Sequence, residues 1–312
     1  MSETSIRGRF VWHELMTTDT RDAARFFNTV IGWKAKPWAG QPSYSMWTIG
    51  RGAPMGGLMP LPDEARAGGT PPCWVTYIAT PDVDETALQA AQYGGRVLRQ
   101  PAEIPTVGRF ALIADPQGAM FAAFTPGRPA SPEKPGAVGV GDFSWHELMT
   151  TDWESAFRFY QRVFGWEATG AFSDPAFGTY QMYGRNGRTL GGMFNAPAAG
   201  GLKPAWLPYI RVADARKTAA AIGKAGGTVI NGPMEVPGGD WITQAVDPQG
   251  VMFAVHSLKP APARKKKTPA PGKKAAPKRK AAPKRKAAPT KKKAASRRKA
   301  APSKKTASKR RR

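Results

Sequence analysis

The sequence predicts an α+β fold made of two copies of one repeated unit, followed by a strongly basic segment. Residues 12–19 read WHELMTTD, and residues 145–152 read the same. Runs of strand-like residues alternate with single amphipathic helices in each copy, which indicates α+β architecture. The charge is divided too: residues 259–312 hold 25 of the 47 Lys and Arg and no acidic residue, so residues 1–258 are neutral.

The repeat extends well beyond the shared octapeptide. Two copies of about 130 residues suit two domains and not a short-period solenoid. We therefore expect a first domain at 1–127, a Pro- and Gly-rich linker at 128–139, a second domain at 140–258 and a basic tail at 259–312. The matching residues of the two copies are Ala23, Phe26, Phe27, Val30, Gly32, Trp33, Trp74, Tyr77, Ile78 and the DPQG turn at 115–118, against Ala156, Phe159, Tyr160, Val163, Gly165, Trp166, Trp206, Tyr209, Ile210 and the DPQG turn at 247–250.

Each element of the first copy has a local signal. Residues 9–16 alternate like a strand, Asp19 is placed to cap a helix with its apolar residues on one face, and Gly32 is placed to end it. The order then restarts after three short strands, which gives two βαβββ units per copy and four in the chain. The remaining expected elements are strands near 33–38, 44–49, 54–59, 73–79, 96–99, 108–114 and 119–124, and a helix at 82–93.

Composition excludes several classes of protein. A single cysteine, Cys73, excludes a disulfide framework and a cysteine-based zinc site, and favours a reducing compartment. The first fifteen residues have no signal-peptide pattern, and no run of about 18 apolar residues could span a membrane. These observations predict a cytoplasmic protein without a membrane partner.

Two doubled motifs carry a resemblance to a known family. They are WHELMTTD followed by an aromatic pair and a Gly-Trp, and DPQG followed two residues later by Phe. With these motifs the sequence resembles the vicinal oxygen chelate superfamily, which contains glyoxalases, bleomycin-resistance proteins and extradiol dioxygenases. It is most similar to tandem glyoxalase-like members, among them a mycobacterial culture-filtrate antigen. The resemblance covers about 1–126 and 138–258, and implies that each copy folds as a curved half-barrel sheet.

The resemblance also indicates where a metal would be bound. Ligands in metal-dependent members lie seven residues before the Asp that opens each helix and seven after the Asp of the DPQG turn. A divalent cation needs several converging N or O donors, and these positions are apolar, so we expect no metal and no other cofactor. A register error of one residue would place His13 and His146 at the first position, still without a carboxylate on the last strand. The positions in the expected register are Trp12, Val75 and Ala122, and Trp145, Leu207 and Ala254.

Strand alternation sorts the candidate site residues. Side chains two apart share a face, so Glu14 and Glu147 would line the two cavities, with raised pKa values and a role in proton transfer or ligand binding. The alternative is a structural pairing with a buried Arg or Tyr. His256 is a candidate proton shuttle beside Glu147, or a residue at the start of the tail. The ligand-binding candidates are Trp12, Met16, Tyr77, Trp145, Met149, Tyr209 and Arg211.

Several of these residues also have ordinary structural explanations. The aromatic residues could be core residues, and Arg211 could form a surface ion pair. His13 and His146 are expected to pack under the helices. The Gly pairs at 56–57 and 191–192 favour a β-bulge over a site where a ligand approaches the backbone.

The basic tail repeats Lys, Arg, Ala and Pro without any aromatic residue. It cannot bury enough surface to offset its ordering entropy, and it resembles the tails of linker histone H1 and of bacterial histone-like proteins. Its cations would neutralise phosphates without reading sequence. DNA is the expected partner, with RNA, polyphosphate or anionic lipid as rivals and a solubility role as the alternative. The candidate nucleic-acid-binding residues are Lys265, Lys266, Lys267, Lys278, Arg279, Lys280, Lys284, Arg285 and Lys286.

Three functions fit these observations. The first is a metal-free glyoxalase-like protein that binds a small metabolite or toxic compound and transfers a proton through a glutamate, as a lyase or isomerase. The second is a non-catalytic binding module, as in bleomycin resistance. The third is a nucleoid-associated protein whose body senses a ligand or forms homo-oligomers.

Overall fold

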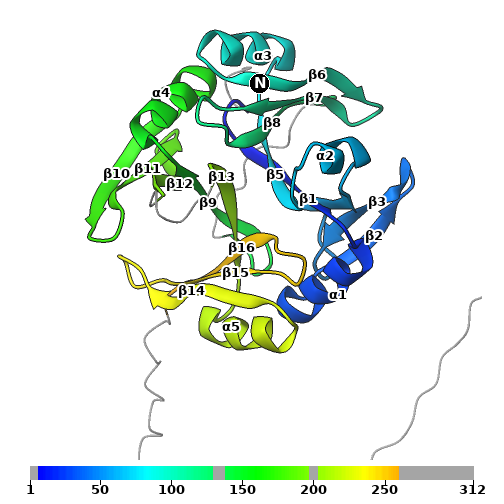
Figure 1. The fold of residues 1–312 in the computed structure, drawn as a ribbon, viewed down its shortest axis with the longest axis vertical. Helices are drawn as coiled ribbons and strands as arrows, with labels where there is room; N and C mark the ends of the chain where they lie inside the picture. Colours follow the sequence, from blue (N-terminus) through cyan, green and yellow to red (C-terminus); the bar gives the residue numbers. More distant parts are fainter. Residues whose placement is uncertain (1–5, 129–137, 197–202, 260–312) are drawn as a thin grey trace, which may run out of the picture. The chain divides into compact units, whose positions relative to one another are not determined.

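The computed structural model describes residues 6–128, 138–196 and 203–259. These described residues belong to one compact unit (Figure 1). The candidate nucleic-acid-binding residues of the tail lie outside the described residues, so the tail stays a prediction.

The described chain has the expected doubled order of elements, and the predicted fold class is confirmed. A short helix, α2, is an addition that the sequence patterns did not indicate. The first copy contains β1 (Phe10–Thr17), α1 (Thr20–Ile31), β2 (Lys34–Trp38), β3 (Gln41–Thr48), β4 (Gly56–Pro60), α2 (Asp63–Ala67), β5 (Cys73–Ala79), α3 (Val83–Gln92), β6 (Arg96–Ile104), β7 (Gly108–Ala114) and β8 (Met120–Pro126). The second contains β9 (Phe143–Thr150), α4 (Trp153–Phe164), β10 (Glu167–Asp174), β11 (Gly178–Arg185), β12 (Arg188–Asn195), β13 (Ala205–Arg211), α5 (Ala215–Lys224), β14 (Thr228–Glu235), β15 (Trp241–Val246) and β16 (Met252–Ser257).

Each copy forms one eight-stranded sheet with the same strand order. The first is β2-β3-β4-β1-β5-β8-β7-β6, and the second is β10-β11-β12-β9-β13-β16-β15-β14. Strand β1 runs parallel to β4 and antiparallel to β5, so Glu14 lies between Gly57 and Val75. In the second sheet Glu147 lies between Gly192 and Leu207. The WHE motif therefore occupies the centre of each sheet.

The helix boundaries follow the predicted signals. The Asp19 side chain accepts hydrogen bonds from the backbone N–H groups of Arg21 and Asp22, as an N-cap should. Gly32 ends α1 with a φ of 88°, in the left-handed region that glycine adopts without strain. Asp152 and Gly165 do the same for α4.

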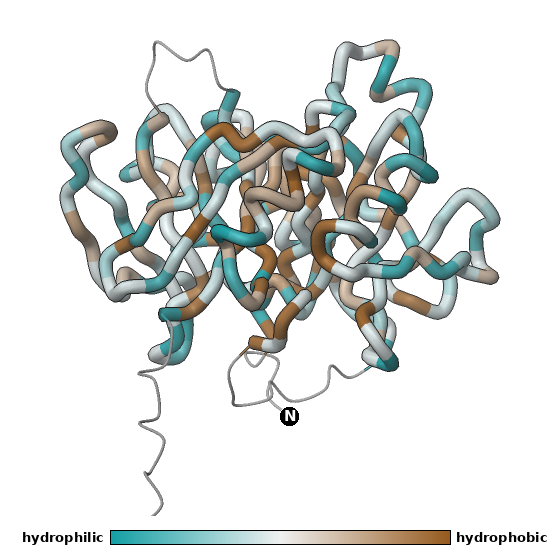
Figure 2. Tube along the Cα trace, turned by 90° about the horizontal axis from the view of Figure 1, so that it is seen from below, coloured by the Kyte–Doolittle hydropathy of each residue, from teal (hydrophilic) through white to brown (hydrophobic). Residues whose placement is uncertain are grey.

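The two copies share their hydrophobic cores. Helix α3 of the first copy packs with α4 of the second, and α1 packs with α5, as Figure 1 also shows. The largest fully buried side chains include Trp33, Trp47 and Trp166, which lie in these shared clusters. In Figure 2 apolar (brown) stretches run through the middle of the molecule. Since burial of these aromatics involves both sheets, the copies stabilise one another.

A pair of histidines joins the two central strands. His13 Nε2 lies 2.8 Å from His146 Nε2, and each ring is stacked on a phenylalanine of the other copy, Phe143 or Phe10. Burial lowers the pKa of both, that of His146 to about 3. The sequence predicted that these histidines pack under the helices. Both are buried, and the contact between them across the two copies was not predicted.

Candidate active site in two cups

The opposite face of each sheet carries a cluster of apolar side chains around the central glutamate. We call these the first cup, around Glu14, and the second cup, around Glu147. The first cup includes Trp12, Met16, Val75, Tyr77, Ala122, Phe110 and Phe124. The second includes Trp145, Met149, Leu207, Tyr209, Ala254, Phe194 and Ile242.

The carboxylate of the first cup is held by tyrosines. The Tyr77 hydroxyl donates to Glu14 Oε1 at 3.3 Å. Trp12 Nε1 donates to the Tyr44 hydroxyl at 2.9 Å, and Tyr44 in turn interacts with Glu14. Glu14 is only 9% exposed. A strand-centre carboxylate is therefore buried among aromatic rings and bonded to hydroxyl groups.

The second cup has a more complete hydrogen-bond network. Trp145 Nε1 donates to the Tyr180 hydroxyl, which donates to Glu147 Oε2, both at 2.9 Å. The Tyr209 hydroxyl donates to Glu147 Oε1 at 3.0 Å. Gln244 Nε2 donates to the same oxygen at 2.9 Å and to the Tyr209 hydroxyl at 2.7 Å. Tyr180, Tyr209 and Gln244 thus all donate to one carboxylate that is 5% exposed.

The glycine pairs make room for this network. A Cβ atom on Gly57 would lie 1.8 Å from the Tyr44 hydroxyl, and one on Gly192 would lie 2.0 Å from the Tyr180 ring. The second glycine of each pair therefore lets a tyrosine lie over the strand and reach the glutamate. The expected bulge was wrong at Gly56 and Gly57, where β4 pairs with both β1 and β3 without a register shift. In the second copy β12 pairs regularly with β9, but its pairing with β11 shifts register between Gly191 and Thr189, next to the glycine pair.

The two cups differ on the strands that come later in the sequence. Leu112 on β7 and Gln244 on β15 hold equivalent places beside Ala122 and Ala254. Next to them lie Arg99 in the first sheet and Asn231 in the second. Asn231 Nδ2 donates to Gln244 Oε1 at 3.1 Å, which orients the amide toward Glu147.

These differences change the electrostatics of the carboxylates. Burial raises the pKa of Glu14, while Tyr44, Tyr77 and the Arg99 cation act against that rise. Burial raises the pKa of Glu147 to about 7, even though Tyr180, Tyr209 and Gln244 oppose it. The groups that set the pKa of Glu147 include no cation, so this glutamate can change its protonation state near neutral pH.

In the second cup the aromatic wall consists of phenylalanine rings around Tyr180. The Phe172 ring is stacked on the Tyr180 ring at a centroid distance of 4.9 Å, and Phe177 lies 4.5 Å from Phe194. Phe194 replaces Met59 of the first cup, as the strand pairing shows. Flat rings on one side of a buried carboxylate suit a flat ligand.

Two predicted site residues have partners other than the glutamate. His256 is bonded to Ser144 and Asp240, and Arg211 Nη1 donates to the Val138 carbonyl at 2.9 Å. Met16 and Met149 are buried in the cup floors. The candidate list missed Tyr44 and Tyr180, although a Tyr-x-Met pattern at 44–46 and 180–182 repeats in both copies and could have revealed them. It also missed Gln244 and Arg99, which differ between the copies.

The residues present do not fit a divalent cation in either cup. The positions that carry ligands in metal-dependent relatives hold Trp12, Val75 and Ala122, and these cluster together without a donor set. Each cup offers one carboxylate. Within 6–128, 138–196 and 203–259, no three His, Cys, Asp or Glu side chains are grouped so that they could hold a metal.

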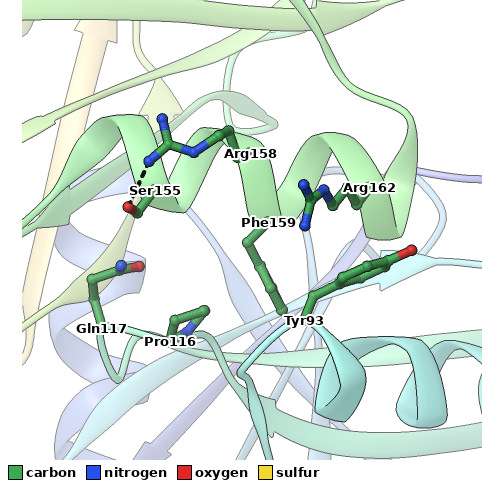
Figure 3. Close-up of a pocket in the computed structure, with 7 residues that line it drawn as sticks. All are labelled: Tyr93, Pro116, Gln117, Ser155, Arg158, Phe159 and Arg162. Carbon is green, nitrogen blue, oxygen red and sulfur yellow. Dashed lines mark hydrogen bonds between the residues drawn. The ribbon is translucent and has the colours of Figure 1, made fainter.

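A groove of about 280 Å³ lies outside the cups, between α4 and the turn at 115–118 (Figure 3). At the equivalent turn of the second copy, the Gln249 side-chain oxygen accepts from the hydroxyl groups of Thr17 and Thr18 and from the backbone N–H of Asp19. In the described part of the chain the Gln117 side chain makes no equivalent set of bonds, and its buried Oε1 has no hydrogen-bond partner. The residues lining the groove are Tyr93, Pro116, Gln117, Ser155, Arg158, Phe159 and Arg162, none of which belongs to a cup.

Among the helices within the described ranges, none combines the length and the apolar character that crossing a bilayer requires.

Comparison with known proteins places this architecture among relatives. The chain is 34% identical over 259 residues to "Putative glyoxylase CFP32" of Mycobacterium bovis, with 80% of this chain and 94% of that protein covered. It is 27% identical over 269 residues to "Anthracycline biosynthesis protein DauV" of Streptomyces sp., with 81% and 94% covered.

Solved structures share the fold at low sequence identity. The 2,3-dioxygenase LapB from Pseudomonas sp. KL28 is 12% identical, with a TM-score of 0.58 over 83% of this chain and 96% of that one. The Mn(II)-bound glyoxalase from Novosphingobium aromaticivorans is 16% identical, with a TM-score of 0.55 over 82% and 84%. The profile of the Glyoxalase/Bleomycin resistance protein/Dioxygenase superfamily matches residues 9–123 and 143–255. The chain belongs to this superfamily and carries its domain twice.

Proposed function

We propose that the second cup binds a small, flat, partly apolar compound with a hydroxyl group, and that Glu147 accepts that group's hydrogen bond or its proton. The observation that carries the proposal is the Glu147 network. A carboxylate has about four acceptor positions, and donors from described residues take three of them: two on Oε1 and one on Oε2. One position on Oε2 is left for a donor group of a ligand.

The wall of the second cup supports a flat aromatic ligand. Phe172, Phe177 and Phe194 surround Tyr180 at ring distances of 4.9 to 6.1 Å. One relative is named for anthracycline biosynthesis, and anthracyclines are flat ring systems with phenolic hydroxyl groups. A hydroxylated polycyclic aromatic compound is therefore the class of ligand we favour.

Binding is tested by titrating the full chain with an anthracycline and following tryptophan fluorescence. Glu147→Gln keeps the side-chain shape and removes the charged acceptor, so affinity should fall at least about tenfold, since hydrogen bonds to charged groups contribute about 1.5–3 kcal/mol. Glu85→Gln, an exposed glutamate on α3, is the matched control and should bind like the wild type. Equal affinity of both variants would contradict the proposed site.

Proton transfer is a second step of the same proposal. A base with a pKa near 7 is suited to take a proton from a carbon acid at neutral pH. Solvent-deuterium exchange into the saturating ligand, followed by NMR, should occur in the wild type and stop in Glu147→Gln. If exchange continues unchanged in the variant, Glu147 is not the base; if the wild type shows none while Glu147→Gln weakens binding, the cup is a non-catalytic binding site.

We also propose that the basic tail associates with DNA and places the protein on the nucleoid. The support is compositional: 25 cations and no acidic residue in 54 positions, next to a neutral body. This role of the tail leads to the alternative function. In it, the chain is a non-catalytic nucleoid-associated protein whose body senses a ligand or forms oligomers.

Deleting residues 259–312 tests the role of the tail. The full chain should bind duplex DNA with an affinity that falls by about 0.9 log unit per neutralised phosphate for each log unit of salt. The truncated chain should lose this binding. If it binds DNA equally well, the tail hypothesis is wrong, and tighter binding to RNA, polyphosphate or anionic vesicles would change the assigned partner.

A further inference from the structure

Three polar side chains at one end of the second cup form a chain of hydrogen bonds that ligand binding at Glu147 does not use. His256 Nδ1 lies 3.1 Å from Ser144 Oγ, and His256 Nε2 lies 3.0 Å from Asp240 Oδ2. Asp240 is fixed in turn, because its other oxygen accepts from the backbone N–H of Lys259 at 2.7 Å. Ser144, His256 and Asp240 are all partly buried.

The partners define the direction of these bonds. Burial raises the pKa of Asp240, but the hydrogen bonds from His256 and from the Lys259 N–H outweigh this and hold the pKa below its ordinary value. An ionised carboxylate only accepts, so neutral His256 carries its proton on Nε2 and leaves Nδ1 as an acceptor, a tautomer assigned from its partners. The Ser144 hydroxyl has two acceptors within reach, His256 Nδ1 at 3.1 Å and the Tyr209 carbonyl at 3.3 Å. Donation to the nearer one, Nδ1, is the arrangement of an activated serine.

Ser144 lies at an irregularity in the pairing of its strand. Tyr209 pairs with Trp145 and Ile210 pairs with Phe143, so the register between β9 and β13 shifts at Ser144. Such bulges aim a side chain in a direction that a regular strand would not allow, and they are frequent near active sites.

A buried N–H group without a hydrogen-bond partner among the described residues lies next to Ser144, His256 and Asp240. Arg211 is the ladder neighbour of His256. Its Nη1 donates to Val138, while its buried Nε has no hydrogen-bond partner among the described residues. An unsatisfied buried N–H is costly, and this one is available to an oxygen of a bound molecule.

The fold does not require this constellation. The strand pairings place Val11, Phe124, Gly108 and Ala79 of the first copy at the positions of Ser144, His256, Asp240 and Arg211. The same architecture is therefore built in the first copy without any of the four polar groups.

We propose that Ser144 is a nucleophile that takes the acyl group of a small ester with an apolar acyl chain. The Ser144 oxygen attacks the ester carbonyl carbon while its proton passes to His256 Nδ1, and Arg211 Nε donates to the carbonyl oxygen as it becomes negative. The ester C–O bond then breaks, and the leaving alcohol takes the proton from His256. Water cleaves the acyl-serine in the same way, releasing a carboxylic acid and restoring Ser144.

The surroundings limit the acyl chain to an apolar one. Ile242, which belongs to the apolar cluster of the second cup, is the ladder partner of His256. Trp145 follows Ser144 and belongs to the same cluster. An acyl chain on Ser144 would lie against these two side chains. This activity does not depend on Glu147.

A fluorophosphonate with a short alkyl chain tests the proposal on the full chain. Ser144 Oγ should displace fluoride and form one covalent phosphonyl adduct, seen in the intact mass and located by peptide mapping. Ser144→Ala should form none. Asp240→Asn should slow labelling about 10²-fold or more, because His256 loses its orienting acceptor. Ser45→Ala, a half-buried strand serine of the first copy, is the matched control and should react like the wild type.

Hydrolysis of p-nitrophenyl acetate supplies a second readout. A burst of nitrophenolate equal to the protein concentration should disappear in Ser144→Ala and persist in Ser45→Ala. Absence of an adduct at Ser144 in folded wild-type protein, or an adduct on another residue that accounts for the burst, would overturn the proposal. Should Asp240→Asn fail to fold, the wild-type adduct and the Ser144→Ala result still decide.

Discussion

The two cups begin from the same sequence and end with different electrostatics. Each has Trp and Glu on its central strand and a tyrosine on each side, and each tryptophan donates to a tyrosine at 2.9 Å. They differ at two neighbouring positions on the far strands, where Arg99 and Leu112 of the first cup correspond to Asn231 and Gln244 of the second. The comparison shows that the WHE motif places the carboxylate, while strands about 90 residues later decide how its charge is compensated.

As a consequence, the two copies differ in how the charge of the cup glutamate is compensated. In the first cup the Arg99 cation stabilises the charge on Glu14. In the second, neutral donors alone surround Glu147, and the pKa rises to about 7. Of the two carboxylates, the one without a cation is the one suited to exchange a proton or to bind a ligand's hydroxyl group.

The largest expected effect on stability is at a glycine that both cups have beside the tyrosine. Gly192→Ala should lower the free energy of unfolding by about 4 kcal/mol, because its Cβ would overlap the Tyr180 ring and displace a hydrogen bond to a charged group. Urea unfolding measures this. Gly223→Ala in α5, where nothing lies near the added Cβ, is the control and should stabilise by about 0.5 kcal/mol. A small loss at Gly192 would mean that the tyrosine is not held over the strand.

The second largest effect is the pH dependence of the unfolding free energy, which should reveal the raised pKa of Glu147 in the second cup. The pKa of Glu147 is raised from 4.5 to about 7, so the folded state binds this proton more tightly than the unfolded state. Its contribution is fully present below about pH 4.5 and is lost as the pH rises toward 7, a change of about 3 kcal/mol. Glu147→Gln should remove this loss when unfolding free energies of variant and wild type are compared across the range. A parallel dependence in both proteins would show that Glu147 keeps an ordinary pKa.

Much of this architecture could be predicted from the sequence, because its signals are local or repeated. The duplicated octapeptide gave the two sheets, and Asp19 and Gly32 gave the ends of α1. Strand alternation placed Glu14 and Glu147 on the cup faces, where the structure also has them. What could not be predicted depends on contacts between distant strands. Gln244 reaches Glu147 across 97 residues, and no period within one strand indicates such a pair.

Removing the orienting amide sharpens the difference further. Gln244→Leu copies the residue of the first cup and deletes a hydrogen bond to a charged group, so stability at pH 8 should fall by about 2 kcal/mol. The pKa of Glu147 should rise above 7, because one of the groups that lowers it is lost. NMR titration of a labelled glutamate carboxyl would measure this. Arg99→Leu is the comparison in the first cup and should raise the pKa of Glu14. If the pKa of Glu147 does not rise in Gln244→Leu, the network does not control its charge.

The smallest effect tests whether the two copies are coupled at their centre. His13→Phe removes the donor to His146 and leaves a buried acceptor unpaired, at a cost of about 1 kcal/mol. His146→Phe should cost a similar amount. In the double variant two apolar rings replace the pair, so no unpaired nitrogen is left between Phe10 and Phe143. The double variant should therefore lose less stability than the sum of the single variants, and urea unfolding of all four proteins gives the coupling. Additive losses would mean that each histidine acts within its own copy. The two central strands, which carry the cup glutamates next to these histidines, would then not be coupled through this bond.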